Sequence, residues 1–205
     1  MVDGRRGYGE WGTFTEGFAD ALAARLDGLR VLEVFAGNGR LAGMLSARGV
    51  AVTATSLRSG HDGHARGFHH PVLEMDAREA AARLGPDHDV LLMSWPTVTE
   101  AATVCALEWG DGRPLLFLGE VTDYAIGFLG GCATDLFFEV VEPVAPLPGY
   151  EPDSPRDRAL EFAVRGDCAR RWREGARTRE GVLGLSPEAR IEEGAGEPEP
   201  QGPCP

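Results

Sequence analysis

The chain has 205 residues and a formal net charge of −12 at pH 7. This length suits one α/β domain with a sizeable core and is short for two domains. Such an acidic chain repels a phosphate backbone, which argues against a DNA or RNA substrate and favours a small or cationic molecule.

Composition also bears on the expected location. No stretch approaches the ~20 consecutive apolar residues that cross a membrane, and residues 1–10 lack the apolar core of a signal peptide. Every basic side chain is arginine, which suggests a bacterial source with a GC-rich genome. We expect a cytoplasmic protein with reduced thiols, because no metal-ligand spacing connects its four cysteines, Cys105, Cys132, Cys168 and Cys204.

The first predicted element is a helix near the N-terminus. Thr13 or Thr15 can cap it, and it is expected to end at Asp27-Gly28. Its apolar stripe comprises Phe14, Phe18, Ala21, Leu22 and Leu26.

The stretch from Arg30 to Gly43, RVLEVFAGNGRLAG, predicts a buried strand, a glycine turn at 37–39 and a helix. Glycines let the backbone approach a ligand, and the start of a helix presents unpaired N–H groups. A strand, a glycine turn and a helix in this order are typical of a nucleotide-cofactor site. Glu33 is unusual there, because a buried strand accepts a carboxylate only with a partner.

Two cofactors are compatible with this turn. Gly37-x-Gly39-x-x-Ala42 fits the dinucleotide fingerprint. The spacing Glu33-x-Phe35-x-Gly37-x-Gly39 resembles motif I of the Rossmann-like (class I) S-adenosylmethionine-dependent methyltransferases. An acid four residues before Gly37 is poorly placed for an anionic pyrophosphate, whereas S-adenosylmethionine carries an ammonium and a sulfonium. We therefore favour the methyl donor, with an NADP-dependent oxidoreductase as the alternative. The resemblance also implies that the helix before this strand covers the cofactor, so that Tyr8, Trp11 and Thr13 would line the site; otherwise that helix is simply docked on the domain.

The second predicted strand, 50–56, departs from the resemblance. The family usually ends this strand with an acid that binds the ribose hydroxyls, but this chain has Thr53, Thr55 and Ser56. Ser56 or Asp62 is the expected substitute. Arg58 could meet a 2′-phosphate, which keeps the NADP alternative open.

Residues 57–71 hold four of the five histidines. His61-Asp62-x-His64 could supply some of the ligands of a metal site, but the spacing matches no closed zinc motif, so no metal is expected. The segment is either a lid over the substrate, a source of a general base at His61 or His64, or a solvated polar loop.

A short third strand is predicted over 72–77, followed by a helix over 77–84. The resemblance implies that Asp76 accepts a hydrogen bond from the adenine amine and that Ala77 lies beside it. Asp76 is also a suitable N-cap for the helix, and both roles can hold together.

The fourth strand, 88–96, ends at Ser94-Trp95-Pro96. This tripeptide loosely resembles motif IV of amino-methylating enzymes, with serine in place of Asn or Asp, so base methylation is not implied. Trp95 is expected either to contact the cofactor or a planar substrate, or to pack in the core.

A helix over 99–109 precedes an apolar fifth strand, 114–120, which ends at Glu120, a candidate base or amine ligand. A substrate-side loop over 121–131 and a helix over 133–140 follow. Residues 140–145 and 159–165 predict an antiparallel pair, because Leu160, Phe162 and Val164 alternate with polar positions.

The sequence thus predicts an α/β fold of the Rossmann-like methyltransferase type. It would have a mostly parallel seven-stranded sheet, a C-terminal antiparallel hairpin and helices on both faces. Residues 1–166 would form the domain, and residues 167–205 a polar, largely disordered tail.

The expected function is methyl transfer from S-adenosylmethionine to a small molecule in bacterial biosynthesis, without a nucleic-acid or membrane partner. A binding protein that keeps the fold without catalysis is a further alternative. The expected catalytic candidates are His61, His64 and Glu120. The expected cofactor-binding residues are Glu33, Phe35, Ala36, Gly37, Asn38, Gly39, Ser56, Leu57, Asp76, Ala77, Ser94 and Trp95.

Overall fold

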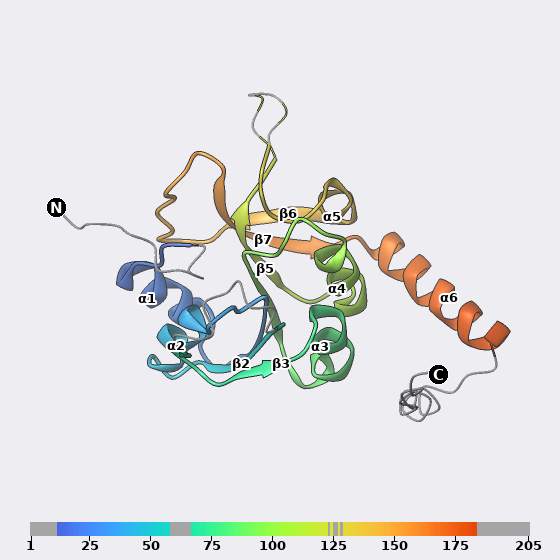
Figure 1. The fold of residues 1–205 in the computed structure, drawn as a ribbon, viewed down its shortest axis with the longest axis horizontal. Coiled ribbons are helices and arrows are strands. Elements are labelled where there is room, and N and C mark those ends of the chain that lie inside the picture. Colours follow the sequence, from blue (N-terminus) through green and yellow to red (C-terminus); the bar gives the residue numbers. More distant parts are fainter. Residues whose placement is uncertain (1–11, 58–66, 123, 125–126, 128, 184–205) are drawn as a thin grey trace, which may run out of the picture.

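The structure is a computed structural model that describes residues 12–57, 67–122, 124, 127 and 129–183 (Figure 1). His61 and His64, the two candidate bases of the histidine-rich segment, lie outside these residues, as do Arg58 and Asp62.

One seven-stranded sheet has the order β3-β2-β1-β4-β5-β7-β6. The first five strands are parallel, and β7 pairs antiparallel with both β5 and β6. The predicted fold class is therefore confirmed, including the C-terminal antiparallel hairpin. The strands are β1 (Arg30–Val34), β2 (Ala51–Ser56), β3 (Val72–Glu74), β4 (Val90–Ser94), β5 (Leu115–Glu120), β6 (Val141–Pro146) and β7 (Asp157–Val164).

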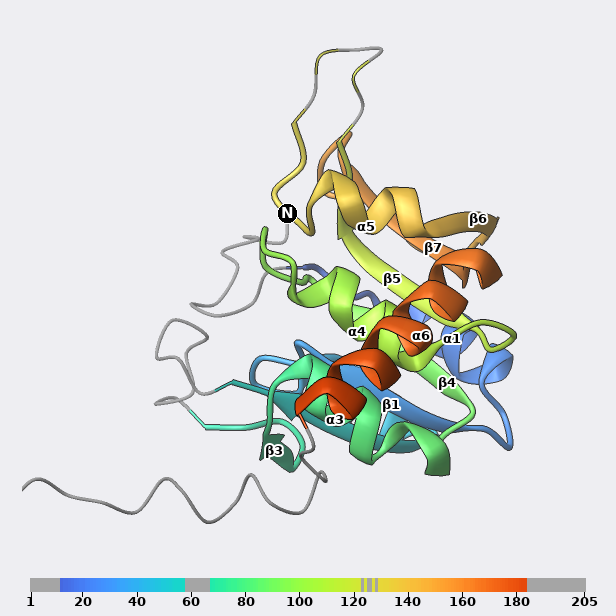
Figure 2. The same cartoon turned by 90° about the vertical axis from the view of Figure 1, so that its right-hand side faces the viewer.

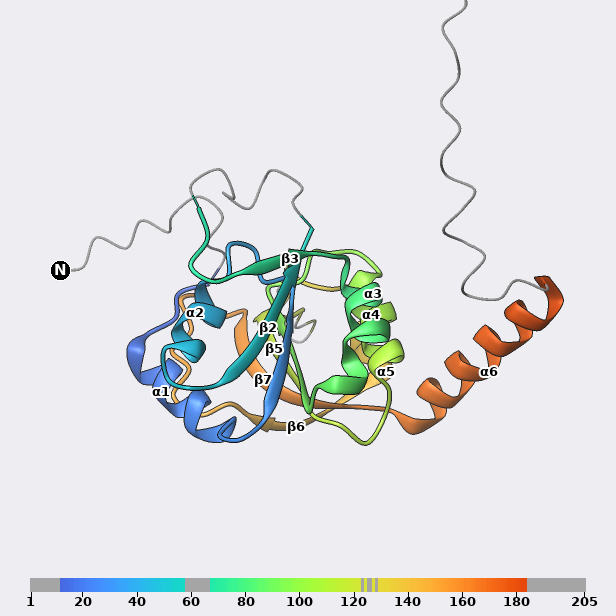
Figure 3. The ribbon, with the colours of Figure 1, turned by 90° about the horizontal axis from the view of Figure 1, so that it is seen from below.

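Helices cover both faces of the sheet (Figure 3). One face carries α1 (Glu16–Arg25) and α2 (Arg40–Ser46), and the other carries α3 (Ala77–Arg83), α4 (Ala101–Trp109) and α5 (Asp135–Val140). A short 3₁₀ turn, Gly85–Asp87, follows α3. This layering is what buried parallel strands require, because apolar side chains leave both sides of each strand.

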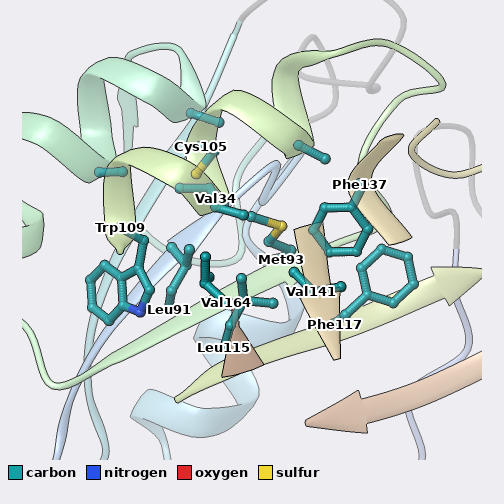
Figure 4. Close-up of a cluster of buried hydrophobic side chains, with 14 of the residues drawn as sticks. Val34, Leu91, Met93, Cys105, Trp109, Leu115, Phe117, Phe137, Val141 and Val164 are labelled. Carbon is teal, nitrogen blue, oxygen red and sulfur yellow. The ribbon is translucent and has the colours of Figure 1, made fainter. Parts of the chain in front are cut away.

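The sheet separates two apolar cores. Between the sheet and α3, α4 and α5, side chains such as Leu91, Met93, Phe117 and Phe137 pack together (Figure 4). Against α1 and α2, the opposite faces of the strands bury Leu92 and other apolar groups. All five residues of β4 are buried, which explains why its sequence, VLLMS, shows no alternation.

Side chains cap the N-termini of helices α1 and α3. Thr15, one of the two predicted caps, accepts a hydrogen bond from the Phe18 N–H at 3.1 Å. Asp76 caps α3 by accepting from the Glu79 N–H at 2.9 Å, which confirms the N-cap role predicted for it. The third strand ends at Glu74 because Met75 and Asp76 turn the chain into this helix.

Gly166–Leu183 form helix α6, within the segment expected to be a polar tail. Ala169 is fully buried, and the Trp172 indole N–H donates to Glu108 of α4 at 2.9 Å. The Arg78 guanidinium of α3 lies over the Trp172 ring. The first turns of α6 thus pack on α4 (Figure 2), and the helix then extends away from the sheet (Figure 3).

Candidate functional site

A pocket lies at the carboxyl edge of the sheet, where β1 and β4 end side by side. In open parallel sheets ligands bind at this edge. Seven of the expected cofactor residues line it: Glu33, Phe35, Ala36, Gly37, Asn38, Ser94 and Trp95. Four further lining residues were not predicted: Gly12, Phe14, Arg40 and Leu41.

Glu33 is the central polar group of this pocket. Its side chain is fully buried, and Oε1 accepts a hydrogen bond from the Ser94 hydroxyl at 2.7 Å. Oε2 is buried and has no hydrogen-bond partner among the described residues. Burial raises the pKa of Glu33 to about 7, although Ser94 and the Ala42 backbone act to lower it. A buried carboxyl with one unused oxygen is suited to receive a cationic N–H group.

The turn that follows Glu33 requires left-handed backbone conformations. Gly37 and Gly39 have φ of 55° and 76°. A Cβ at Gly39 would lie 2.9 Å from Val72 Cγ2, so only glycine suits both the backbone and the space there. Phe35 also has positive φ, 58°, which is costly for a residue with a bulky side chain. This strain is held beside the pocket, as is common at functional sites.

Trp95 also lines the pocket and is strained, with φ of 53°. Its backbone N–H donates to the Leu118 carbonyl at 2.7 Å. Its ring meets Phe14 edge-on at 6.1 Å between centroids. A Cβ at Gly12 would lie 2.3 Å from this ring, so the chain passes directly against it. Trp95 therefore both packs in the core and lines the pocket.

The N-terminal segment contributes Gly12 and Phe14 to this wall. The sequence suggested that residues before the first strand line the site, naming Tyr8, Trp11 and Thr13. Tyr8 and Trp11 lie outside the described residues, and Thr13 is exposed and not among the lining residues. Spacing could not identify Gly12, because its role comes from its contact with a side chain far along the sequence.

The expected ribose and adenine contacts lie further along the same edge. Ser56 ends β2 in a buried position, whereas Leu57 is exposed. The Met75 N–H donates to the Ser56 carbonyl at 3.3 Å, which brings the ends of β2 and β3 together. Asp76 is exposed, and the next residue, Ala77, is buried. A cofactor role for these four residues stays a prediction.

Glu120 ends β5 with its carboxylate held on both oxygens. Oε2 accepts from the Gly131 N–H at 2.9 Å, and Oε1 lies 3.5 Å from a guanidinium nitrogen of Arg156. Arg156 also donates to the Leu129 carbonyl. Glu120 thus ties the segment after β5 to the β6–β7 connection, and its role as a base stays a prediction.

The described residues contain no group of three or more His, Cys, Asp or Glu side chains that could hold a metal ion. No helix among them is long and apolar enough to cross a membrane.

His69, from the histidine-rich segment, contributes to the glycine turn through its backbone. Its N–H donates to the Asn38 carbonyl at 2.9 Å and so supports the turn.

No family model and no curated protein matches the sequence. Among solved structures, a mutant of MtNAS in complex with S-adenosylmethionine aligns with a TM-score of 0.52 and 12% identity, covering 71% of this chain and 58% of that one. MtNAS in complex with MTA and tNA aligns with a TM-score of 0.51 and 12% identity, covering 72% of this chain and 58% of that one. The mitomycin 7-O-methyltransferase MmcR has a TM-score of 0.49 and 15% identity, over 73% of this chain and 53% of that one.

The chain spans less than two thirds of the length of these structures. At such identities, the two alignments above 0.5 establish a shared fold and no more. Together with the strand order, they show that the chain has the Rossmann-like fold expected for class I S-adenosylmethionine-dependent methyltransferases.

Proposed function

We propose that this chain is an S-adenosylmethionine-dependent methyltransferase that acts on a small-molecule acceptor. The observation that carries the proposal is the fully buried Glu33 carboxyl with an unused oxygen, in a pocket at the carboxyl ends of β1 and β4. An ammonium group of the methyl donor would supply the missing partner. A dinucleotide pyrophosphate would instead place two negative groups near a buried acid.

When bound, S-adenosylmethionine supplies an electrophilic methyl group on a sulfonium. The residues of this chain contribute mainly orientation: Glu33 and Ser94 would hold the amino end, and Phe35 and Trp95 would wall the pocket. The acceptor would approach from the same edge, past the ends of β4 and β5. There Glu120 and Arg156 hold the chain that follows β5.

The acceptor class rests on charge and on the absence of a base-methylation motif. The net charge of −12 favours a neutral or cationic small molecule over a polyanion. A cytoplasmic biosynthetic role in a bacterium is part of this proposal, and the arginine-only composition is what supports the bacterial source.

The first experiment is calorimetric titration of the full chain with S-adenosylhomocysteine, and with NADPH in parallel. Saturable binding of S-adenosylhomocysteine alone is the expected result. Binding of NADPH alone, or of neither compound at millimolar concentration, would overturn the proposal. Transfer of a labelled methyl group from S-adenosylmethionine to members of an amine and phenol panel then separates an enzyme from a non-catalytic binding protein.

A further inference from the structure

Exposed apolar side chains occur on the segments that follow β4 and β5. Eight large apolar side chains are exposed among the described residues, and four of them lie on these two segments: Val98 after β4, and Tyr124, Leu129 and Leu136 after β5. A single exposed apolar group is common on a protein surface, whereas several beside a candidate site indicate a binding surface.

Tyr124, Leu129 and Leu136 belong to one local unit, which we call the β5–α5 face. Their exposed fractions are 69%, 67% and 44%. The Tyr124 hydroxyl donates to Asp135 Oδ2 at 2.5 Å, which holds this tyrosine at the first turn of α5, where Leu136 follows. The Leu129 carbonyl accepts from Arg156 of the β6–β7 connection at 3.1 Å.

The base of the segment that carries this face is tightly built. A Cβ at Gly130 would lie 2.5 Å from the carbonyl carbon of Val121, so the backbone touches backbone there. The Gly130 N–H donates to the Thr122 hydroxyl at 3.1 Å, and the Gly131 N–H donates to Glu120 at 2.9 Å. These contacts fix the point from which the exposed side chains project, at the carboxyl end of β5.

The face adjoins the pocket through the paired ends of β4 and β5. Trp95 lines the pocket, and its backbone N–H donates to the Leu118 carbonyl of β5 at 2.7 Å. Next along β5, a Cβ at Gly119 would lie 3.0 Å from Cys132 Sγ, so the chain leading into α5 crosses this strand end closely. A molecule on the β5–α5 face is therefore beside the strand end that borders the pocket.

We propose that the β5–α5 face binds the aromatic body of an uncharged acceptor, which makes phenols and arylamines the substrate class. This inference rests on the proposed function, and it adds the chemical class of the acceptor. Leucine side chains provide apolar contact area, and the Tyr124 ring can pack against a second aromatic ring.

The charged groups at this face favour an uncharged ligand. Glu120 already has Arg156 and the Gly131 N–H as partners, so neither member of this ion pair needs a charge from a ligand. The Asp135 carboxylate accepts from Tyr124 and repels an anion. An apolar ring system covers the exposed side chains and leaves these contacts in place, whereas a charged group would be buried without a partner.

The test measures binding of three probes to the full chain by calorimetry, in the presence of saturating S-adenosylhomocysteine. The probes are 2-naphthol, phenol and 2-naphthoate. The wild type should bind 2-naphthol about tenfold more tightly than phenol, because the second ring covers more apolar surface. It should also bind 2-naphthol about tenfold more tightly than 2-naphthoate, because the anion meets the carboxylate of Asp135.

Two variants remove apolar surface from the face, and a third is their matched control. Leu129→Ser and Leu136→Ser should each weaken 2-naphthol binding about threefold to tenfold, with affinity for S-adenosylhomocysteine unchanged within about twofold. Leu73 is 47% exposed, close to the 44% of Leu136, and lies on β3 at the opposite edge of the sheet. Leu73→Ser should bind 2-naphthol as the wild type does, and thermal unfolding checks that each variant is folded.

Three results would overturn the inference while leaving the proposed function intact. The first is a wild type that binds S-adenosylhomocysteine and shows no preference for 2-naphthol over phenol or 2-naphthoate, or no saturable binding of 2-naphthol. The second is unchanged 2-naphthol affinity in Leu129→Ser and Leu136→Ser. The third is an equal loss of that affinity in Leu73→Ser. A wild type that does not bind S-adenosylhomocysteine overturns the proposed function itself.

Discussion

Replacing Glu33 by Gln should remove a specific pH dependence from the stability of the protein. Burial raises the pKa of Glu33 from 4.5 to about 7, so the folded chain holds this proton more tightly than the unfolded chain. A raised carboxyl pKa contributes stability that is fully present below pH 4.5 and is lost as the pH rises through 7. This rise of the pKa from 4.5 to about 7 corresponds to about 3 kcal/mol of unfolding free energy.

The assay is urea unfolding of the wild type and of Glu33→Gln at several values between pH 4.5 and pH 8. Contributions from other titrating groups are common to both proteins and cancel in the difference. The variant should gain about 3 kcal/mol relative to the wild type across this range and then reach a plateau. A difference that stays constant with pH would refute the argument, because Glu33 would then ionise without a cost from burial.

Two further experiments check the ionisation of Glu33: the Ser94→Ala variant, and the pH dependence of S-adenosylhomocysteine binding. The Ser94 hydroxyl lowers the pKa of Glu33, so its removal should move the stability loss to higher pH. S-adenosylhomocysteine should bind the wild type more tightly as pH rises towards 7, because its ammonium prefers the ionised carboxylate. In Glu33→Gln this pH dependence of affinity should disappear.

Two further predictions concern the edges of the pocket. Phe35→Gly should be more stable than Phe35→Ala by about 1 kcal/mol in urea unfolding. Both variants lose the ring, but only glycine relieves the positive φ of 58°. Equal stability of the two variants would show that the backbone at residue 35 carries no strain. Asp76→Ala should lose about 1 kcal/mol of stability and Asp76→Asn almost none, because asparagine also caps. If Asp76 also binds adenine, both variants should bind S-adenosylhomocysteine more weakly by over about tenfold, and unchanged affinity would leave it only the capping role.

The sequence by itself determined the type and approximate position of the strands and helices, because the residue patterns that indicate them are local. A continuous apolar run marks a strand buried on both faces, as in β4, and alternation marks the hairpin strand β7. Glycine spacing located the turn after β1, and a serine or threonine before an apolar stripe located the start of α1. Element ends shifted by one to three residues where a cap took over, as at Asp76.

The tertiary structure alone decided which of these elements are neighbours, and so which polar groups meet. Glu33 and Ser94 are 61 residues apart, and they meet because β4 pairs with β1. Gly12 lies against Trp95, and Arg40 shares the pocket with Glu33, through contacts that no local pattern encodes. Periodicity reports which face of an element is buried, whereas the partner of a buried charge depends on strand order, a property of the whole chain.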